Sequence, residues 1–257
     1  MSVRPTKALG QHFLVDENFL GVIGRLAGLA PQDVVVEVGP GLGVLTRYLA
    51  DAVHHVHAIE LDHRLEEPLT TTLDGRTNVS LLFADALDVN LESLHPKPCK
   101  LVANLPYNIA TPLVVESLQV APSLGTWCVM VQREVADRFF ARPRTKAYGA
   151  VSVVVQLAAR RTGFHEVPPT AFRPRPRVQS ALVAFARVPG PPLALVRPVV
   201  DAAFAHRRKT LANSVTLAGL ASRSASEAAL QAVGKRPNVR AEELTPAEFV
   251  ALAEALG

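Results

Sequence analysis

The stretch Val34-Val35-Val36-Glu37-Val38-Gly39-Pro40-Gly41-Leu42-Gly43 decides the fold of this chain. A run rich in β-branched residues without regular alternation is typical of a strand that is buried on both faces of a parallel sheet. The glycine-rich segment cannot continue that strand, and residues 44–50 have the apolar spacing of a helix. The stretch therefore predicts a strand, a glycine loop and a helix.

The sequence on either side repeats the alternation of strand and helix. Asp16 is expected to cap an opening helix whose apolar residues run from Phe19 to Ala27. Four further strands, separated by loops or helical patterns, are expected at residues 56–61, 79–83, 100–103 and 127–131. This alternation predicts a parallel, doubly wound sheet.

The pattern changes after Ala147. Residues 151–159 are compatible with a helix or a strand. Residues 164–167 and 180–187 are expected to form a late antiparallel pair around a proline-rich loop.

A Pro-Gly-Pro-Pro stretch at residues 189–192 can continue neither a strand nor a helix and indicates a domain boundary. Beyond it, residues 201–217 have the pattern of a helical pair. Capping boxes that pair Ser224 with Glu227 and Thr245 with Glu248 predict two more helices. The expected fold is an α/β, Rossmann-like domain over residues 1–187 with a small, all-helical C-terminal domain over residues 188–257.

Composition limits the class of protein. A chain of 257 residues, 49% of them hydrophobic, can bury one full core and a small second domain. Lys and Arg outnumber Asp and Glu by 27 to 23, which suits a polyanionic partner without requiring one. The isolated Cys99 and Cys128 form no disulfide or CxxC spacing, and no apolar run spans a bilayer. A soluble, cytoplasmic protein without membrane attachment is therefore expected.

The glycine loop predicts a ligand site. Its spacing at Gly39, Gly41 and Gly43 is GxGxG and not the GxGxxG that cradles a dinucleotide pyrophosphate. Glu60 ends the second strand, where a carboxylate can accept hydrogen bonds from ribose hydroxyls, and Asp85 follows the third, where it can accept from an adenine amino group. The loop and the two acids predict a nucleoside ligand, with NAD and S-adenosylmethionine both open.

A second motif favours S-adenosylmethionine. Asn104-Leu105-Pro106-Tyr107 follows the fourth strand, at the same sheet edge as the glycine loop. An aromatic amine is a poor nucleophile because its lone pair is delocalised into the ring. Hydrogen bonds from the amine to the Asn104 side-chain oxygen and the Leu105 carbonyl would direct that lone pair toward a methyl donor. Pro106 would stiffen the turn, and Tyr107 would stack on a flipped base.

These motifs resemble those of the ribosomal RNA adenine dimethyltransferases, the kasugamycin-resistance methyltransferases that modify two adjacent adenines of small-subunit RNA. The resemblance covers nearly the whole chain. It is carried by LGQHFL at 9–14, EVGPGLG at 37–43, IELD at 59–62, DA at 85–86, NLPYNI at 104–109, QREV at 132–135, KAYG at 146–149 and AFRPRPRVQSA at 171–181.

The resemblance implies roles for individual residues. The methyl donor would be S-adenosylmethionine, without a metal, and the partner would be small-subunit ribosomal RNA or an immature small subunit, bound by a monomer. Asn104 would be shared between the donor and the target adenine, which Phe172 would flank opposite Tyr107. The residues implied to contact the donor are His12, Leu14, Gly39, Gly41, Glu60, Asp85 and Asn104.

Some features depart from the family pattern or lie outside it. Many members have Asn in place of His12, so the side chain at this position departs from the family pattern, whereas its backbone could serve the same contact. Arg173, Arg175 and Arg177 are interpreted either as phosphate contacts or as solvated charges. Basic residues 207–209 are expected to contact RNA. The four histidines between residues 54 and 63 lack a ligand frame, so no metal is expected there.

Three alternative functions share some of these features. The related macrolide-resistance family methylates a large-subunit adenine with the same fold, but Tyr107 and the motif at 171–181 favour the small-subunit family. A non-catalytic RNA-binding assembly factor is disfavoured by the intact motif at 104–107 with both Glu60 and Asp85. A nicotinamide-dependent reductase is disfavoured by the glycine spacing.

Overall fold

Five parallel strands form the part of the sheet that the valine-rich stretch predicts. The computed structural model describes residues 11–206 and 208–257. Neighbouring strands in this part of the sheet are parallel, and the first of them is buried along its whole length. The five are β2 (Val34–Val38), β3 (His55–Glu60), β4 (Val79–Phe83), β5 (Lys100–Asn104) and β6 (Thr126–Gln132). The predicted parallel sheet is confirmed.

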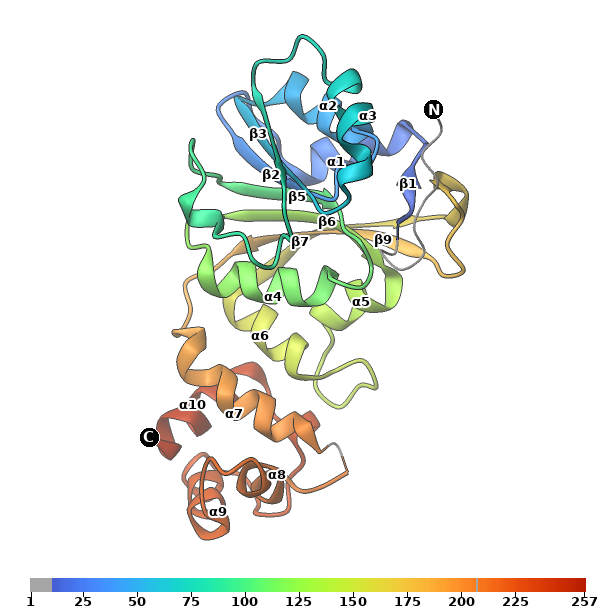
Figure 1. The fold of residues 1–257 in the computed structure, drawn as a ribbon. Coiled ribbons are helices and arrows are strands. Elements are labelled where there is room, and N and C mark those ends of the chain that lie inside the picture. Colours follow the sequence, from blue (N-terminus) through green and yellow to red (C-terminus); the bar gives the residue numbers. More distant parts are fainter. Residues whose placement is uncertain (1–10, 207) are drawn as a thin grey trace. The chain divides into compact units, whose positions relative to one another are not determined.

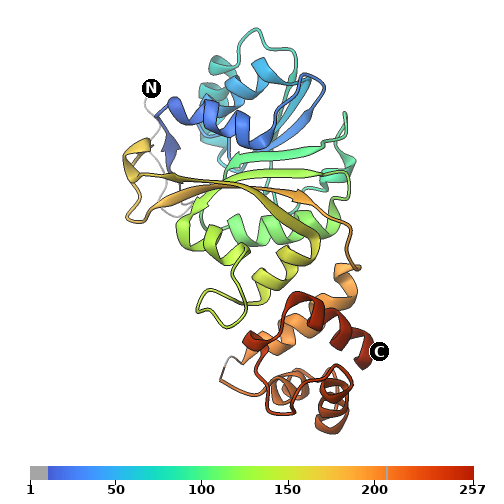
Figure 2. The same cartoon turned by 180° about the vertical axis from the view of Figure 1, so that it is seen from behind.

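Two later strands complete the sheet. β9 (Ser180–Arg187) pairs antiparallel with β6, and β7 (Ala159–Val167) lies next to β9 at the sheet edge. The strand order is β4-β3-β2-β5-β6-β9-β7. Both views show β7 and β9 side by side (Figures 1 and 2). The two segments that the sequence predicts as a pair are therefore neighbours in the sheet.

The strand order determines where a ligand can bind. From β2 the chain proceeds to β3 and β4 on one side, and β5 then returns to the other side of β2. Ligands of open parallel sheets bind beyond the carboxyl ends of the strands at such a reversal. The glycine loop follows β2 and Asn104 ends β5, so both predicted motifs lie at the reversal.

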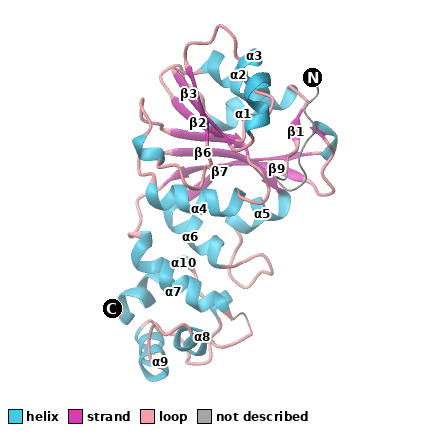
Figure 3. Ribbon diagram, in the orientation of Figure 1, coloured by secondary structure: helices cyan, strands magenta, loops and turns pink. Residues whose placement is uncertain are grey.

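Helices cover both faces of this sheet (Figures 1 and 3). On one face lie α1 (Asn18–Ala27), α2 (Val44–Ala52) and α3 (Glu66–Thr72), and on the other lies α4 (Ala110–Val120), with α5 (Arg133–Phe139) following β6. The core between α1, α2 and the sheet includes the buried Ile23, Leu49, Val35 and Met130. The Asp16 side chain accepts a hydrogen bond of 3.1 Å from the backbone N–H of Asn18, so it does satisfy the first turn of α1, although Glu17 is the residue at the N-cap position.

A two-stranded sheet joins two motifs that are far apart in the sequence. β1 (Phe13–Leu14) pairs antiparallel with β8 (Phe172–Arg173), so that Leu14 lies opposite Phe172. The backbone N–H of Val15 also donates to the carbonyl of Ala171 at 2.9 Å. The N-terminal motif and the proline-rich motif are therefore parts of one wall.

The described chain divides into two compact units. The first contains the described residues up to 136 together with residues 161–187, and the second contains residues 137–160 and 188–257. In the second unit α6 packs against α7 and α10, and the buried Tyr148 donates its hydroxyl hydrogen to the Leu244 carbonyl at 2.8 Å. Its helices are α6 (Ala150–Ala158), α7 (Leu193–Ala205), α8 (Leu211–Leu217), α9 (Arg223–Ala232) and α10 (Pro246–Leu256). Short 3₁₀ turns in the two units are η2 (His63–Leu65), η3 (Leu91–Ser93), η4 (Pro169–Ala171) and η5 (Ala241–Glu243).

Two helix starts differ from the predictions. Helix α7 begins at Leu193, directly after Pro192, and not at Asp201, because Pro fits at the entry to a helix. The cap of α9 is Ser222, whose hydroxyl accepts from the Ala225 N–H at 3.1 Å, whereas Glu227 pairs with Arg223. Several serines in this stretch satisfy the cap pattern, so spacing alone misplaced it by two residues.

The structure also bears on the predicted cap at Thr245, the segment at 151–159 and the domain boundary. Thr245 and Glu248 form the predicted reciprocal cap, with hydrogen bonds of 3.3 and 2.9 Å. The segment at 151–159 is helical up to Ala158 and continues as β7 from Ala159. The division of the chain into domains at 187/188 stays a prediction. In the structure, helix α6 belongs to the same compact unit as the C-terminal helices. No helix within residues 11–206 or 208–257 is long and apolar enough to cross a bilayer.

Candidate active site

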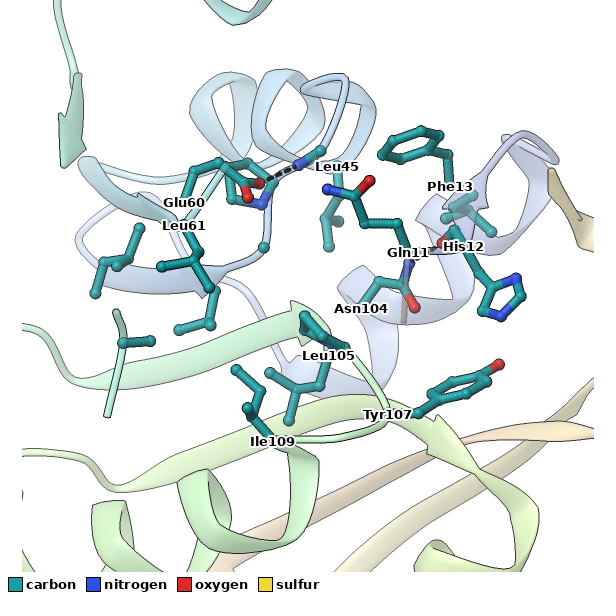
Figure 4. Close-up of a pocket in the computed structure, with 18 of the residues that line it drawn as sticks. Gln11, His12, Phe13, Leu45, Glu60, Leu61, Asn104, Leu105, Tyr107 and Ile109 are labelled. Carbon is teal, nitrogen blue, oxygen red and sulfur yellow. Dashed lines mark hydrogen bonds between the residues drawn. The ribbon is translucent and has the colours of Figure 1, made fainter. Parts of the chain in front are cut away.

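A cavity opens beyond the carboxyl ends of β2, β3, β4 and β5 (Figure 4). The space between its walls, open solvent included, is about 1090 Å³. The wall is built from five segments, 11–14, 38–45, 59–61, 84–86 and 104–109, which are continuous except for position 43. Except for Phe172, all the predicted site residues line this one cavity: His12, Leu14, Gly39, Gly41, Glu60, Asp85, Asn104, Leu105, Pro106 and Tyr107.

The glycine loop is shaped by close approach. Gly39 and Gly41 have φ angles of 72° and 60°, which L side chains rarely adopt. A Cβ atom on Gly41 would lie 2.8 Å from the Phe13 ring, and one on Gly39 would lie 3.1 Å from the Pro106 ring. The loop therefore touches both the N-terminal motif and the motif at 104–107, and glycine is required for that contact.

Glu60 holds the glycine loop from the end of β3. Its buried carboxylate accepts hydrogen bonds from the backbone N–H groups of Gly41 at 3.1 Å and of Asp62 at 3.0 Å. Burial raises the pKa of Glu60, and these backbone donors partly oppose that shift. Each carboxylate oxygen keeps a further lone pair, so Glu60 can still accept from ligand hydroxyls.

The neighbouring Asp62 is tied to two other residues. The Arg64 guanidinium and the Gln11 amide both bind its carboxylate, and these contacts lower its pKa to about 2. Gln11 also lines the cavity, so this hydrogen bond of 3.0 Å joins the N-terminal motif to the end of β3. Sequence analysis missed the pair, because nothing in the spacing relates residues 51 positions apart.

Asp85 lies at the end of β4 and is half-buried. One carboxylate oxygen accepts from the backbone N–H of Leu87 at 2.9 Å, in a turn that fixes the side chain. The contact of its other oxygen with a ligand amino group stays a prediction.

Asn104 is oriented by the N-terminal motif. Its side-chain N–H donates a hydrogen bond of 2.9 Å to the backbone carbonyl of His12 (Figure 4). Since the amide nitrogen is committed to His12, the amide oxygen is the atom left to accept a hydrogen bond from a ligand. This is the orientation that the proposed activation of an amine requires.

The Tyr107 ring is held from two sides. Its hydroxyl hydrogen-bonds the Ser180 hydroxyl at 2.6 Å, and the His12 ring lies 5.3 Å from its centroid. Burial raises the pKa of Tyr107, so the phenol stays neutral. Ser180 is the fully buried first residue of β9. Although Ser180 stands in a quoted motif, sequence analysis assigned it no role.

The His12 side chain turns toward the proline-rich loop. Its Nδ1 atom lies within hydrogen-bond distance, 2.7 Å, of the Pro174 carbonyl oxygen. His12 therefore contacts Asn104 through its backbone, and Tyr107 and Pro174 through its ring. A contact between this ring and the methyl donor stays a prediction.

Phe172 is the predicted site residue that lies outside the cavity wall. Its side chain is 1% exposed and packs in the hydrophobic core. The pairing of β8 with β1 places Phe172 opposite Leu14, which belongs to the same core. The resemblance could not indicate this burial. Its position opposite Tyr107 across a bound base therefore stays a prediction.

The remaining predicted contacts are basic. Arg173, the last residue of β8, is exposed, as are Arg175 and Arg177 on the loop between β8 and β9. Arg208 and Lys209 are exposed after α7, and Arg207 lies outside the described residues.

One buried acid next to the site received no role. Glu37, on β2, is 1% exposed, and burial raises its pKa to about 8. One of its carboxylate oxygens has no hydrogen-bond partner among residues 11–206 and 208–257. The sequence feature that could have indicated Glu37 is a charged residue within a run of valines.

The family model described as "Ribosomal RNA adenine dimethylase" matches residues 4–256. The chain belongs to the ribosomal RNA adenine dimethylase family. Two curated relatives carry the name "Ribosomal RNA small subunit methyltransferase A". The relative from Kineococcus radiotolerans is 48% identical over 98% of this chain and 86% of its own length. The relative from Rubrobacter xylanophilus is 47% identical over 97% of this chain and 94% of its own length.

Solved structures agree on the fold. A dimethyladenosine transferase from Plasmodium falciparum has a TM-score of 0.79 at 23% identity, over 94% of this chain and 96% of that one. The 23S rRNA methyltransferase ErmE has a TM-score of 0.68 at 30% identity, over 95% of this chain and 99% of that one. The Rossmann-like class I methyltransferase fold with C-terminal helices is confirmed.

Family membership decides between the two donors left open by the glycine loop. The chain is an S-adenosylmethionine-dependent methyltransferase that acts on adenine in ribosomal RNA. The described residues hold no group of three or more His, Cys, Asp or Glu side chains that could bind a metal ion.

Proposed function

We propose that this chain transfers methyl groups from S-adenosylmethionine to the N6 amino group of two adjacent adenines in small-subunit (16S) ribosomal RNA, two methyl groups to each. The observation that carries the proposal is the Asn104 amide, whose nitrogen donates to the His12 carbonyl so that its oxygen is left to accept from an amine. The names of the 40–48% identical relatives support the small subunit as the source of the RNA.

The wall of the cavity fits S-adenosylmethionine. The positive-φ glycines bring backbone, without side chains, to one end of the cavity, where the methionine part of the donor would lie. The Glu60 carboxylate is an acceptor for ribose hydroxyls, and Asp85 keeps an oxygen for the adenine amino group. The donor supplies a methyl group on a sulfonium, which is already an activated leaving group.

The target adenine would enter beside Asn104. Its N6 amine would donate hydrogen bonds to the Asn104 oxygen and the Leu105 carbonyl, which directs the nitrogen lone pair toward the donor methyl carbon. As the N–C bond forms, the C–S bond breaks, sulfur keeps the electron pair and the nitrogen releases a proton. Positioning for in-line displacement supplies most of the rate, so no strong general base is needed.

Tyr107 and Phe172 complete the target site in this proposal. Stacking of the flipped base on Tyr107 is worth about 1–3 kcal/mol, which offsets much of a flipping cost of a few kcal/mol. Because the second transfer acts on a monomethylated amine, the space near Asn104 must hold one methyl group beyond the bare amine.

The wider setting is part of the same proposal. The substrate is small-subunit RNA, free or in an immature particle, and the protein acts as a cytoplasmic monomer. Residues 188–257 are proposed to help dock the RNA or the particle, using the exposed Arg208 and Lys209 together with Arg207.

The test is the transfer of labelled methyl groups to unmodified small subunits, large subunits and free ribosomal RNA, followed by nucleoside analysis. Dimethyladenosine confined to small-subunit RNA is expected. Label in the large subunit would assign the chain to the macrolide-resistance type of activity, and no transfer to any RNA would indicate a non-catalytic assembly factor.

A further inference from the structure

An aromatic ring lies beside two guanidinium groups at the sheet edge farthest from β4. Phe164 is on the edge strand β7, with the Arg133 guanidinium carbon 4.9 Å and the Arg161 guanidinium carbon 5.8 Å from its ring centroid. Arg161 is exposed and Phe164 is half-buried. The next residue, His165, is also exposed and meets the Phe19 ring edge-on at 5.9 Å.

This cluster is joined directly to the target side of the active site. Arg133 follows β6, and its backbone N–H donates to the Gln179 carbonyl at 2.9 Å. The next residue, Ser180, hydrogen-bonds the Tyr107 hydroxyl. The cluster and the proposed stacking ring are therefore anchored to the same end of β9.

The surroundings of the cluster are basic. Three exposed arginines follow along the chain: Arg173 is the last residue of β8, and Arg175 and Arg177 are on the loop that runs from β8 back to β9. Glu166 forms an ion pair with Arg133, and its side chain is 65% exposed. That carboxylate partly neutralises the cluster while remaining open to displacement by another anion.

Guanidinium groups beside an accessible aromatic ring match the chemistry of RNA. Arginines bind phosphates and stack on bases through their planar faces, and aromatic rings stack on unpaired bases. Two arginines beside one ring, with three more exposed arginines at residues 173–177, favour a polyanion that also carries planar groups.

We propose that Arg133, Arg161 and Phe164 form, with the arginine loop at 173–177, a docking surface for the RNA strand that flanks the target adenine. Phosphates bind the guanidinium groups, and an unpaired base stacks on Phe164 and its arginines. The inference rests on the proposed function, since it names the contacts of the same RNA substrate outside the catalytic cavity.

The test compares Arg161→Gln, Phe164→Leu and Glu166→Gln with wild type, and Arg76→Gln is the matched control. Arg76 precedes β4 at the opposite edge of the sheet and pairs with Asp51. Binding of each protein to protein-free small-subunit ribosomal RNA and to the unmodified small subunit is measured over a range of salt concentrations, together with steady-state methyl transfer.

Arg161→Gln is expected to weaken RNA binding about 3- to 10-fold and to reduce the slope of log K against log salt by about 0.7–0.9, the loss of one phosphate contact. Phe164→Leu should weaken RNA binding with an unchanged salt slope, because a stacking contact carries no charge. Glu166→Gln should tighten RNA binding at least twofold, because it removes a negative charge from the surface that meets the RNA phosphates. The KM for S-adenosylmethionine should stay the same in all of them.

Two results would overturn the inference while leaving the proposed function intact. In the first, wild type is active, the RNA affinity of Arg161→Gln equals that of the control Arg76→Gln, and Glu166→Gln binds RNA no more tightly than wild type does. The other is a loss of particle binding without a loss for protein-free RNA, which would make the surface a contact for ribosomal protein. If wild type methylates no RNA, the proposed function itself fails.

Discussion

The side-chain amide of Asn104 is hydrogen-bonded to the backbone carbonyl of His12, 92 residues earlier in the chain, at 2.9 Å. This contact commits the amide nitrogen and leaves the amide oxygen to accept a hydrogen bond from a target amine. The N-terminal motif therefore forms part of the cavity wall and also orients Asn104, and its strand β1 is in turn paired with β8.

His12 is expected to act as a positioning residue through its ring. His12→Ala removes the contacts with the Pro174 carbonyl and the Tyr107 ring, and the single-turnover transfer rate should fall about 10-fold, or ~1.4 kcal/mol. His12→Asn should stay within about 3-fold of wild type, because an Asn Nδ2 can reach the same carbonyl. Equal rates for the two variants would contradict this role. A fall in donor affinity in His12→Ala would instead indicate a contact with the donor.

Glu60 should make donor binding sensitive to acid. Burial raises the pKa of this carboxyl, so it protonates at a higher pH than an exposed glutamate with a pKa near 4.5. Since the ionised form accepts from ribose hydroxyls, donor affinity should be full above the raised pKa of Glu60 and should fall as pH drops through it. Calorimetric titration with S-adenosylhomocysteine from pH 8 to pH 4.5 measures this.

Glu60→Gln is the matched control for that experiment. It should weaken binding about 10-fold at pH 8, consistent with ~1.5 kcal/mol for hydrogen bonds to a charged group. It should also remove the part of the acid dependence that Glu60 causes. An unchanged pH profile in Glu60→Gln would mean that another buried acid, such as Glu37, causes the dependence.

Tyr107 should contribute by stacking more than by its hydroxyl. Tyr107→Ala is expected to raise the KM for RNA by about 5- to 150-fold, since base stacking is worth about 1–3 kcal/mol. Tyr107→Phe keeps the ring but loses the hydrogen bond with Ser180, and its effect should be under about 5-fold. Steady-state kinetics with unmodified small subunits separates the two. A larger effect in Tyr107→Phe than in Tyr107→Ala would refute the stacking role.

Much of the fold and of the donor site could be predicted from local patterns. The valine run, the glycine spacing and the strand-end acids Glu60 and Asp85 each depend on a few consecutive residues, and parallel strands bring their carboxyl ends to one edge. The cavity wall that results contains ten of the eleven predicted site residues, the exception being Phe172.

The parts that could not be predicted depend on tertiary pairing. The contacts Gln11–Asp62 and Tyr107–Ser180 join residues 51 and 73 positions apart, and no periodicity encodes them. Phe172 is buried because β8 pairs with β1, a register that the sequence motif does not reveal. The predicted start of α9 was wrong because both Ser222 and Ser224 are suitable cap residues, and the structure uses Ser222.

Single-turnover methyl transfer by Asn104→Ala to unmodified small subunits, at saturating donor, tests the central claim most directly. Removal of the amide oxygen should reduce the rate at least 100-fold, about 2.7 kcal/mol, while the Kd for the donor rises only a few-fold. Wild type should produce dimethyladenosine and the variant essentially none. A variant rate within a few-fold of wild type would contradict the claim that Asn104 activates the target amine.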